Sequence, residues 1–448
     1  MGLRTLLAVL VLPLACGART ALLPGGAGDT GGGSGGGGPG ATPLAVACNA
    51  ALLEGAPTPI AGYCTTRANQ APLNGPRVGP QIVWSATPFP IVSPEDYLPA
   101  ETVVDATGRA YVAINASPQN ATGGPNQILA VNADGSVAWM SSFASTVGDL
   151  ALGRDGHLWF LEEGAAVSLS CPTSCPFSLS AVSPDGAPVA TLDPLPGAAF
   201  DSFTLMAITS DGGFFLASPG DLSRLTTDGT QVWQTYANLG SSLVVGPDDG
   251  VIAAGNGQLQ AYDAAGQEAW LGPEASLAAV GAEGDVVALS SPDGQTLSLV
   301  TVGTGGNVVA EVALGSPQFN ASQLAVAGDG TAVVLLANEG TAPGLTKAHV
   351  QVIAVDTSGK TRWTTPFDVT LPYDPADLTT HYGVFVDAAG TVVVTAGTVM
   401  GLDLGSGSVL WTLQPAKAES CLRPAVLGTG GAILATQCDG TVFLARDP

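Results

Sequence analysis

The chain has 448 residues, of which 46% are apolar, 11% are charged and 60 are glycine. A composition rich in apolar residues and turn-forming glycines, and poor in charge, favours buried β-strands over solvent-facing helices. The 37 Asp and Glu residues against 13 Lys and Arg give a formal net charge of −24, and this negative field disfavours binding to nucleic acid or to anionic membrane surfaces.

The N-terminus has the pattern of an export signal. Arg4 supplies positive charge ahead of a short apolar stretch, residues 6–15, which is too short to remain as a membrane-spanning helix. The sequence LPLACG then resembles a bacterial lipoprotein signal in which Cys16 is lipidated, although Pro13 stands where Leu is usual. We therefore predict an exported lipoprotein, anchored in the outer membrane by this lipid alone, on its periplasmic or its surface side. Ordinary signal cleavage is the alternative.

Two segments separate the signal, residues 1–16, from the rest of the chain. Residues 17–40 are mainly Gly and form a flexible tether. Residues 41–80 are expected to form a small lead-in closed by a disulfide. Without Cys16 the number of cysteines is six, an even set that indicates disulfides in an exported protein. The simplest of the possible pairings is sequential: Cys48–Cys64, Cys171–Cys175 and Cys421–Cys438.

From residue 81 onward one unit recurs, made of a strand, a short Gly turn and a strand that ends in Trp. Full copies place Gly four residues before Trp, as at Gly135 and Trp139. Two degenerate copies, residues 179–190 and 299–310, keep the turn and have Ala in place of Trp. A second Gly-turn hairpin alternates with the first in eight copies. Two hairpins together make the four-stranded blade of a β-propeller.

The two ends of the repeat complement each other. One orphan strand, residues 81–85, opens the array with Trp84, and the array ends in a three-stranded piece without an outer-strand Trp. The pattern predicts an all-β fold, an eight-bladed β-propeller of four-stranded antiparallel blades over residues 81–448. The N-terminal strand closes the last blade and removes the open edges. We interpret every Trp except Trp159 as packing between blades.

The unit xxxVDxxGxxxW resembles the repeat of the PQQ-type, quinoprotein-like β-propeller family over residues 81–448. Resemblance to the dehydrogenases of this kind implies a quinone, a calcium ion and a catalytic Asp. The sequence lacks their adjacent Cys-Cys pair, and it lacks a C-x-x-C-H haem motif. His157, His349 and His381 lie in separate blades without metal-ligand spacing. We therefore predict no cofactor, no metal site and no catalytic residue.

Topology indicates where a partner would bind. In a meander the first-to-second and third-to-fourth turns share one face, and these are tight Gly turns here. All the long connections fall on the other face, and long loops on a rigid scaffold concentrate binding function. We take these connections to be 85–100, 116–126, 164–176, 339–349 and 364–380, which leaves the third to fifth blades plain.

We predict that a protein or glycan of the cell envelope binds a monomeric propeller on this face. The predicted contact residues are exposed aromatics and neighbouring carboxylates: Asp96, Tyr97, Tyr373, Asp374 and Asp377. The eight-bladed lipoprotein of the outer-membrane protein assembly machinery is similar in shape, which implies a scaffold role. The alternative is an enzyme, either a quinoprotein-like dehydrogenase or a hydrolase, with its site at the mouth of the central channel.

Overall fold

A computed structural model gives the fold. It describes residues 56, 58, 69–88, 97–116, 126–143, 145–163, 177–192, 205–209, 211–218, 220–237, 242–245, 250–255, 257–281, 284–315, 321–339, 346–371, 382–415 and 421–448.

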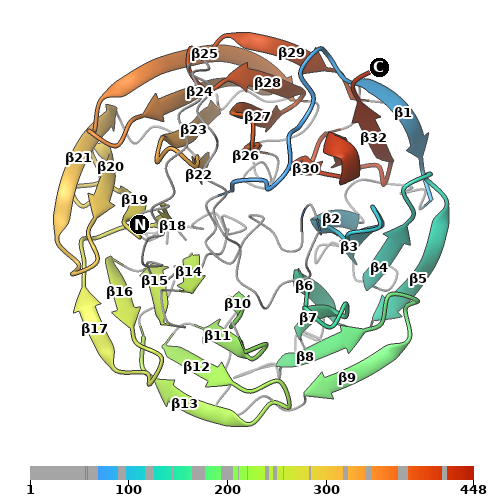
Figure 1. Cartoon of the computed structure of the whole chain (residues 1–448), viewed down its shortest axis with the longest axis horizontal. Helices are drawn as coiled ribbons and strands as arrows, with labels where there is room; N and C mark the ends of the chain where they lie inside the picture. Colours follow the sequence, from blue (N-terminus) through green and yellow to red (C-terminus); the bar gives the residue numbers. More distant parts are fainter. Residues whose placement is uncertain are drawn as a thin grey trace, which may run out of the picture.

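The described strands form eight four-stranded antiparallel sheets arranged as a ring (Figure 1). This confirms the predicted eight-bladed β-propeller. The strands of each blade are given from the ring centre to the rim. Blade 1 consists of β2 (Tyr97–Val104), β3 (Ala110–Ala116), β4 (Asn126–Val131) and β5 (Val137–Phe143), and blade 2 of β6 (Thr146–Leu152), β7 (Leu158–Glu163), β8 (Phe177–Val182) and β9 (Pro188–Leu192). Blade 3 consists of β10 (Leu205–Ile208), β11 (Phe214–Ser218), β12 (Asp221–Leu225) and β13 (Gln231–Thr235), and blade 4 of β14 (Ser242–Val245), β15 (Val251–Gly255), β16 (Gln258–Tyr262) and β17 (Glu268–Leu271).

Blades 5 to 8 follow in the same order around the ring. Blade 5 consists of β18 (Leu277–Val280), β19 (Val286–Ser290), β20 (Leu297–Val302) and β21 (Val308–Gly315), and blade 6 of β22 (Ala321–Val326), β23 (Ala332–Glu339), β24 (Thr346–Val355) and β25 (Thr361–Leu371). Blade 7 consists of β26 (Tyr382–Val386), β27 (Thr391–Ala396), β28 (Val399–Asp403) and β29 (Val409–Leu413), and blade 8 of β30 (Val426–Leu427), β31 (Ile433–Thr436), β32 (Val442–Arg446) and β1 (Gln81–Ala86). A short 3-10 helix, Thr429–Gly431, links β30 to β31. No helix in the described part is long and apolar enough to cross a membrane.

Blade 8 is closed by the N-terminal strand, as predicted. β1 pairs with β32 from Gln81 opposite Arg446 to Ala86 opposite Val442, so it runs one residue beyond the predicted strand 81–85. The last blade therefore takes its outer strand from one end of the chain and its other three strands from the opposite end. This pairing turns an open array into a ring without exposed terminal edges.

Burial explains the low charge of the repeats. All six residues of β4 are buried, as are all residues of β14, β19 and β27, because these strands are covered on both faces by neighbouring blades. One apolar cluster, for example, joins Leu335 of blade 6 to Val384 of blade 7. Strands covered on both faces read as continuous apolar runs. The outer strands instead alternate between half-buried and exposed residues, as in β21.

The recurring Trp couples each blade to the next. The indole of Trp233 donates a 2.9 Å hydrogen bond from Nε1 to the carbonyl of Ala264, in the third-to-fourth turn of blade 4. A Cβ on Gly266 of that turn would lie 2.6 Å from the Trp233 ring, and Gly266 has a φ of 79°. Only glycine meets both demands. The Gly and Trp of the motif thus belong to two interfaces, since each Gly receives the Trp of the preceding blade.

The same contact recurs around the ring, and the degenerate copies replace it. Trp84, Trp139 and Trp363 donate in the same way to carbonyls in the next blade. Blade 2 has Ala190 in place of Trp, and there Leu192 fills the space against Gly229. A smaller apolar side chain therefore substitutes for the indole where the sequence departs from the motif.

Predicted loop boundaries are wrong at two places. Residues 85–100 were expected to be a loop, yet β1 runs to Ala86 and β2 begins at Tyr97. The stretches 339–349 and 364–380 were expected to be loops, yet β24 and β25 stay paired from Val355 and Thr361 out to Thr346 and Leu371. The reason is the packing of alternate residues, since Phe367 and Val369 lie against the apolar cluster between blades 6 and 7. Pro366 suggests a break in the strand, but an outer strand tolerates proline because its free edge needs no ladder hydrogen bond.

Candidate binding surface

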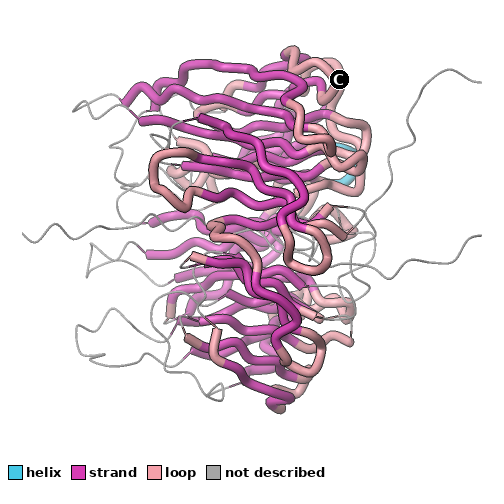
Figure 2. Tube along the Cα trace, turned by 90° about the vertical axis from the view of Figure 1, so that its left-hand side faces the viewer, coloured by secondary structure: helices cyan, strands magenta, loops and turns pink. Residues whose placement is uncertain are grey.

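The strands run between the two faces of the ring (Figure 2). The first-to-second and third-to-fourth turns define the turn face, and the other connections define the loop face. The turns are closed by their own aspartates: Asp263 Oδ1 accepts 2.9 Å hydrogen bonds from the backbone N–H groups of Ala265 and Gln267. Asp155 similarly holds His157, with 2.8 Å between Oδ2 and Nδ1. The side-chain carboxylates of these two turns thus make their hydrogen bonds within the turn itself.

In two other tight turns, hydrogen bonds lower the pKa of the turn aspartate. The Ser136 hydroxyl holds the pKa of Asp134 below its usual value, and the Ser358 hydroxyl does the same for the pKa of Asp356. Both carboxylates are therefore charged at neutral pH, and their stabilising effect is lost only as the pH falls through the lowered pKa. These negative charges of the turn face are therefore already hydrogen-bonded within their own turns.

The described residues before β1, 56, 58 and 69–80, are here called the N-terminal segment, and they lie against inner strands at the turn face. Thr58 pairs with Val104 at the end of β2, and its Oγ1 donates a 2.7 Å hydrogen bond to the carbonyl of Leu427 at the end of β30. Farther along, the Ala71 N–H donates a 2.8 Å bond to the carbonyl of Val386 at the end of β26. The inner strands of blades 1, 7 and 8 thus all end against this segment.

Two further hydrogen bonds that involve buried polar side chains also hold the N-terminal segment. Asn69 Nδ2 donates a 2.7 Å hydrogen bond to the carbonyl of Leu324 in β22, which adds blade 6 to the contact. The Gly75 N–H donates a 2.6 Å bond to Oδ2 of Asp387, a side chain that is only 1% exposed. A buried carboxylate needs hydrogen-bond donors, and residues that precede the first strand supply one of them to Asp387.

The segment also replaces a missing turn. Blade 8 has no third-to-fourth turn, since its outer strand comes from the other end of the chain. Trp411 donates a 2.8 Å bond from Nε1 to the carbonyl of Pro76 instead, and Asp447 Oδ2 accepts a 2.7 Å bond from the Arg77 N–H. This role of residues 69–80 was not predicted from the sequence. The available signal was Trp411, which has no turn in blade 8 to receive it.

The predicted contact residues fall largely outside the described residues: Asp96, Tyr373, Asp374 and Asp377. Tyr97 is the first residue of β2, where its backbone pairs with Ala116. Tyr373 follows the end of β25 at Leu371. Both strand ends lie on the loop face, but β2 is at the ring centre in blade 1 and β25 is at the rim in blade 6, with blades 7 and 8 between them (Figure 1).

The inner strands are mainly small and apolar, as LMAI in β10 and LAAV in β18 illustrate. Two carboxylates on β2 and β6 are exceptions. Glu101 accepts a 2.6 Å hydrogen bond from the Leu150 N–H, and Asp149, whose φ is 54°, accepts a 2.9 Å bond from the Met206 N–H. Each carboxylate thus bridges to the inner strand of the next blade. No three His, Cys, Asp or Glu side chains of the described part are placed to hold a metal ion.

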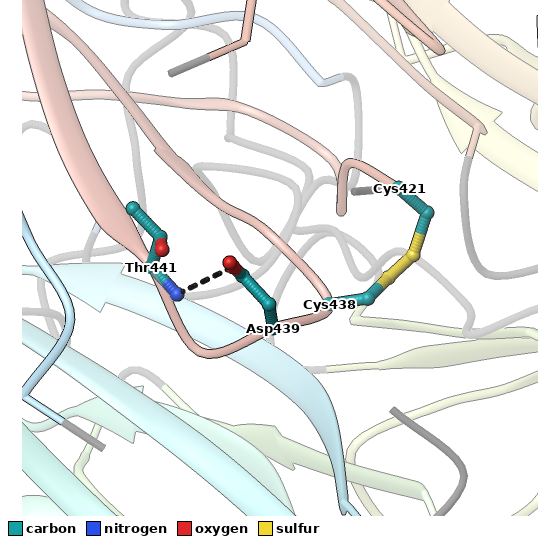
Figure 3. Close-up of a disulfide and its surroundings, with 4 residues drawn as sticks. All are labelled: Cys421, Cys438, Asp439 and Thr441. Carbon is teal, nitrogen blue, oxygen red and sulfur yellow. Dashed lines mark hydrogen bonds between the residues drawn. A yellow bond between two sulfur atoms is a disulfide. The ribbon is translucent and has the colours of Figure 1, made fainter. Parts of the chain in front are cut away.

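One predicted cysteine pair is brought together on the loop face. Cys421 and Cys438 are joined by a disulfide with a Cα separation of 5.3 Å (Figure 3). They flank the hairpin of β30 and β31, and the Cys438 N–H donates a 3.0 Å bond to the Cys421 carbonyl. The bridge lies just beyond the ends of these two strands. The other cysteines fall outside the described residues: Cys16, Cys48, Cys64, Cys171 and Cys175.

Comparison with known proteins gives a family for the second part of the ring. Residues 282–447 match the family model described as outer membrane protein assembly factor BamB. Over these residues the chain is similar to PQQ-type propellers. The match runs from β19 through blades 6 and 7 to the C-terminal strands of blade 8, and it confirms the resemblance drawn from the Trp-bearing hairpin. No curated protein matches the chain.

Solved structures with a similar arrangement share little sequence with this chain. A streptogramin B lyase structure is 13% identical with a TM-score of 0.43, covering 81% of this chain and 97% of that one. The Pan2 WD40 domain of Neurospora crassa is 12% identical with a TM-score of 0.41, covering 68% and 90%. A protein of unknown function from Bacteroides caccae is 15% identical with a TM-score of 0.30, covering 55% and 92%.

Proposed function

We propose that this protein is a non-enzymatic scaffold of the cell envelope, whose propeller binds a protein partner through its loop face. The observation that carries the proposal is the covered turn face, where the inner strands of blades 1, 7 and 8 end against the chain's own Thr58 and Ala71. Because the chain's own residues already lie against the turn face, we place the partner on the loop face. The match of residues 282–447 to an outer membrane protein assembly factor supports a protein over a glycan at this face.

The inner strands favour this role over the alternative of an enzyme at the channel mouth. An active site needs polar side chains that converge on a substrate. The two inner-strand carboxylates, Glu101 and Asp149, instead accept hydrogen bonds from the backbone of the neighbouring blade. In the described inner strands we find no observation that specifically favours a dehydrogenase or a hydrolase.

Paired alanine substitution tests the proposed surface. Replacing Tyr97 and Tyr373 together is expected to weaken partner capture from an envelope extract by about tenfold or more, because tyrosines are frequent hot spots of protein interfaces. The matched control replaces Asp155 and Asp228, which lie in tight turns on the opposite face. The proposal is wrong if capture is lost in the aspartate pair and retained in the tyrosine pair.

The membrane anchor is tested separately. We expect Cys16→Ser to shift the protein from the membrane fraction to the soluble fraction, because a lipid chain on this residue is the only anchor we propose. Cell fractionation followed by immunoblotting measures the shift, with the unaltered chain as the control. A Cys16→Ser variant that still sediments with membranes would place the anchor elsewhere.

A further inference from the structure

The repeated blades provide an internal standard for the rim of the ring, and blade 3 departs from it. One position after the outer-strand Trp, the residues are Ser85, Met140, Gln234, Leu271, Thr364 and Thr412. Three positions after Trp they are Thr87, Ser142, Tyr236, Pro273, Pro366 and Gln414. Among these six blades, blade 3 alone combines an amide with an aromatic ring. Packing between blades does not require this combination, since the other blades do without it.

Tyr236 presents its ring on a rigid support. The residue follows β13 at the rim (Figure 1) and its side chain is 75% exposed. Its ring lies beside Gly220, where an added Cβ would be 3.5 Å from Tyr236 Cε2. Its backbone is held from two sides, since the Tyr262 hydroxyl donates a 3.2 Å bond to its carbonyl and the Ala237 N–H donates a 3.3 Å bond to the Gly220 carbonyl. An exposed aromatic ring on a fixed backbone loses little entropy when it binds a ligand.

Amides and a carboxylate extend from this ring along the strand. Gln234 Nε2 donates a 3.1 Å hydrogen bond to Asp221 Oδ1, and Gln231 Nε2 lies 3.4 Å from Gln234 Oε1. Gln234 and Tyr236 share the outward face because side chains alternate along a strand. In blade 4, Gln260 Oε1 lies 3.0 Å from the Tyr262 hydroxyl and shares its one proton with the Tyr236 carbonyl. Burial and the charge of Glu268 raise the pKa of Tyr262, so the hydroxyl keeps this proton. We name this set, Asp221, Gln231, Gln234, Tyr236 and Gln260, the Tyr236 strip.

We infer that the Tyr236 strip binds a neutral oligosaccharide. The C–H groups on one face of a pyranose ring are attracted to the negative face of an aromatic ring. Sugar hydroxyls both donate and accept, as do the amides of the strip, and its carboxylate accepts. The strip contains no Lys or Arg, and the chain carries a net charge of −24, so an anionic glycan is disfavoured. From Gln231 to Tyr236 the strand extends about 17 Å, a length that suits a short oligosaccharide.

This site is separate from the protein partner proposed for the loop face. Isothermal titration of the full chain with cellohexaose, maltohexaose and N-acetylchitohexaose tests it, with oligogalacturonate and poly-lysine as charged comparators. We expect at least one neutral hexasaccharide to bind. Tyr236→Ala should weaken that binding by about tenfold or more, and Gln234→Ala by a smaller factor. The control is Met140→Ala, which removes an exposed side chain (48% exposure) at the blade 1 position equivalent to Gln234, and it should bind as the unaltered chain does.

The outcomes separate this inference from the proposed function. Absence of binding by all three neutral sugars overturns the inference, as does a Tyr236→Ala variant with unchanged affinity and an unchanged thermal transition. Binding of poly-lysine that depends on Tyr236, without binding of the sugars, would assign the strip to a cationic partner and also overturn it. None of these results bears on partner capture through Tyr97 and Tyr373, which is measured by a different assay and concerns residues of blades 1 and 6, not of blade 3.

Discussion

Trp411→Ala is expected to lower the free energy of unfolding by about 4 kcal/mol, because replacing a large buried aromatic by Ala removes apolar contacts and leaves a cavity. Trp411 lies in the apolar cluster that includes Leu427 and Phe443 of blade 8. It also donates the 2.8 Å hydrogen bond to Pro76 that holds the N-terminal segment in place of a turn. Denaturant unfolding, followed by tryptophan fluorescence and circular dichroism, measures the loss.

Trp363→Ala is the matched control for this prediction. Trp363 is buried to a similar extent, and its Nε1 donates a 2.7 Å bond to Leu404 in an intact turn of blade 7. Both variants should lose stability. Only Trp411→Ala should increase hydrogen exchange in residues 69–80 and β1, because only there does the indole hold the ring closure. Equal protection of these residues in the two variants would contradict the role given to the N-terminal segment.

The repeat carried most of the fold prediction. Each hairpin has its own Gly turn and apolar alternation, so local sequence defines every blade. Ring closure could be predicted because the orphan strand with Trp84 and the three-stranded end complement each other. The rim residues Gln234 and Tyr236 could also have been found, by comparing equivalent positions across blades. Because the blades repeat, both the shared motif and the blade that departs from it can be recognised in the sequence.

The contacts of the N-terminal segment could not be predicted in the same way. Residues 69–80 follow no repeat, and they are fixed by distant groups such as Asp387 and Asp447. A pattern in one segment does not reveal a partner more than 300 residues away, as the 312-residue separation of Gly75 and Asp387 illustrates. The same limit hid the length of β25, where packing of Phe367 against a neighbouring blade extends the strand through Pro366.

The disulfide of blade 8 is expected to contribute about 3 kcal/mol to stability, because a cross-link over a loop of this size restricts the unfolded chain. The two cysteines are separated by 17 residues in the sequence. Blade 8 is where such a constraint matters most, since β30 contributes only two pairs to β31, Val426 with Leu434 and Leu427 with Ile433. The disulfide thus adds a covalent link beside a β30–β31 ladder of only two residue pairs.

Thermal and denaturant unfolding of a Cys421→Ser, Cys438→Ser double variant tests this contribution. Replacing both residues avoids an unpaired buried thiol, since the two side chains are 3% and 2% exposed. The variant should lose about 3 kcal/mol relative to the oxidised chain. It should resemble the unaltered chain unfolded in the presence of a reductant, which serves as the control. Equal stability of the double variant and the oxidised chain would mean that the short β30–β31 ladder and the N-terminal segment hold blade 8 without the bridge.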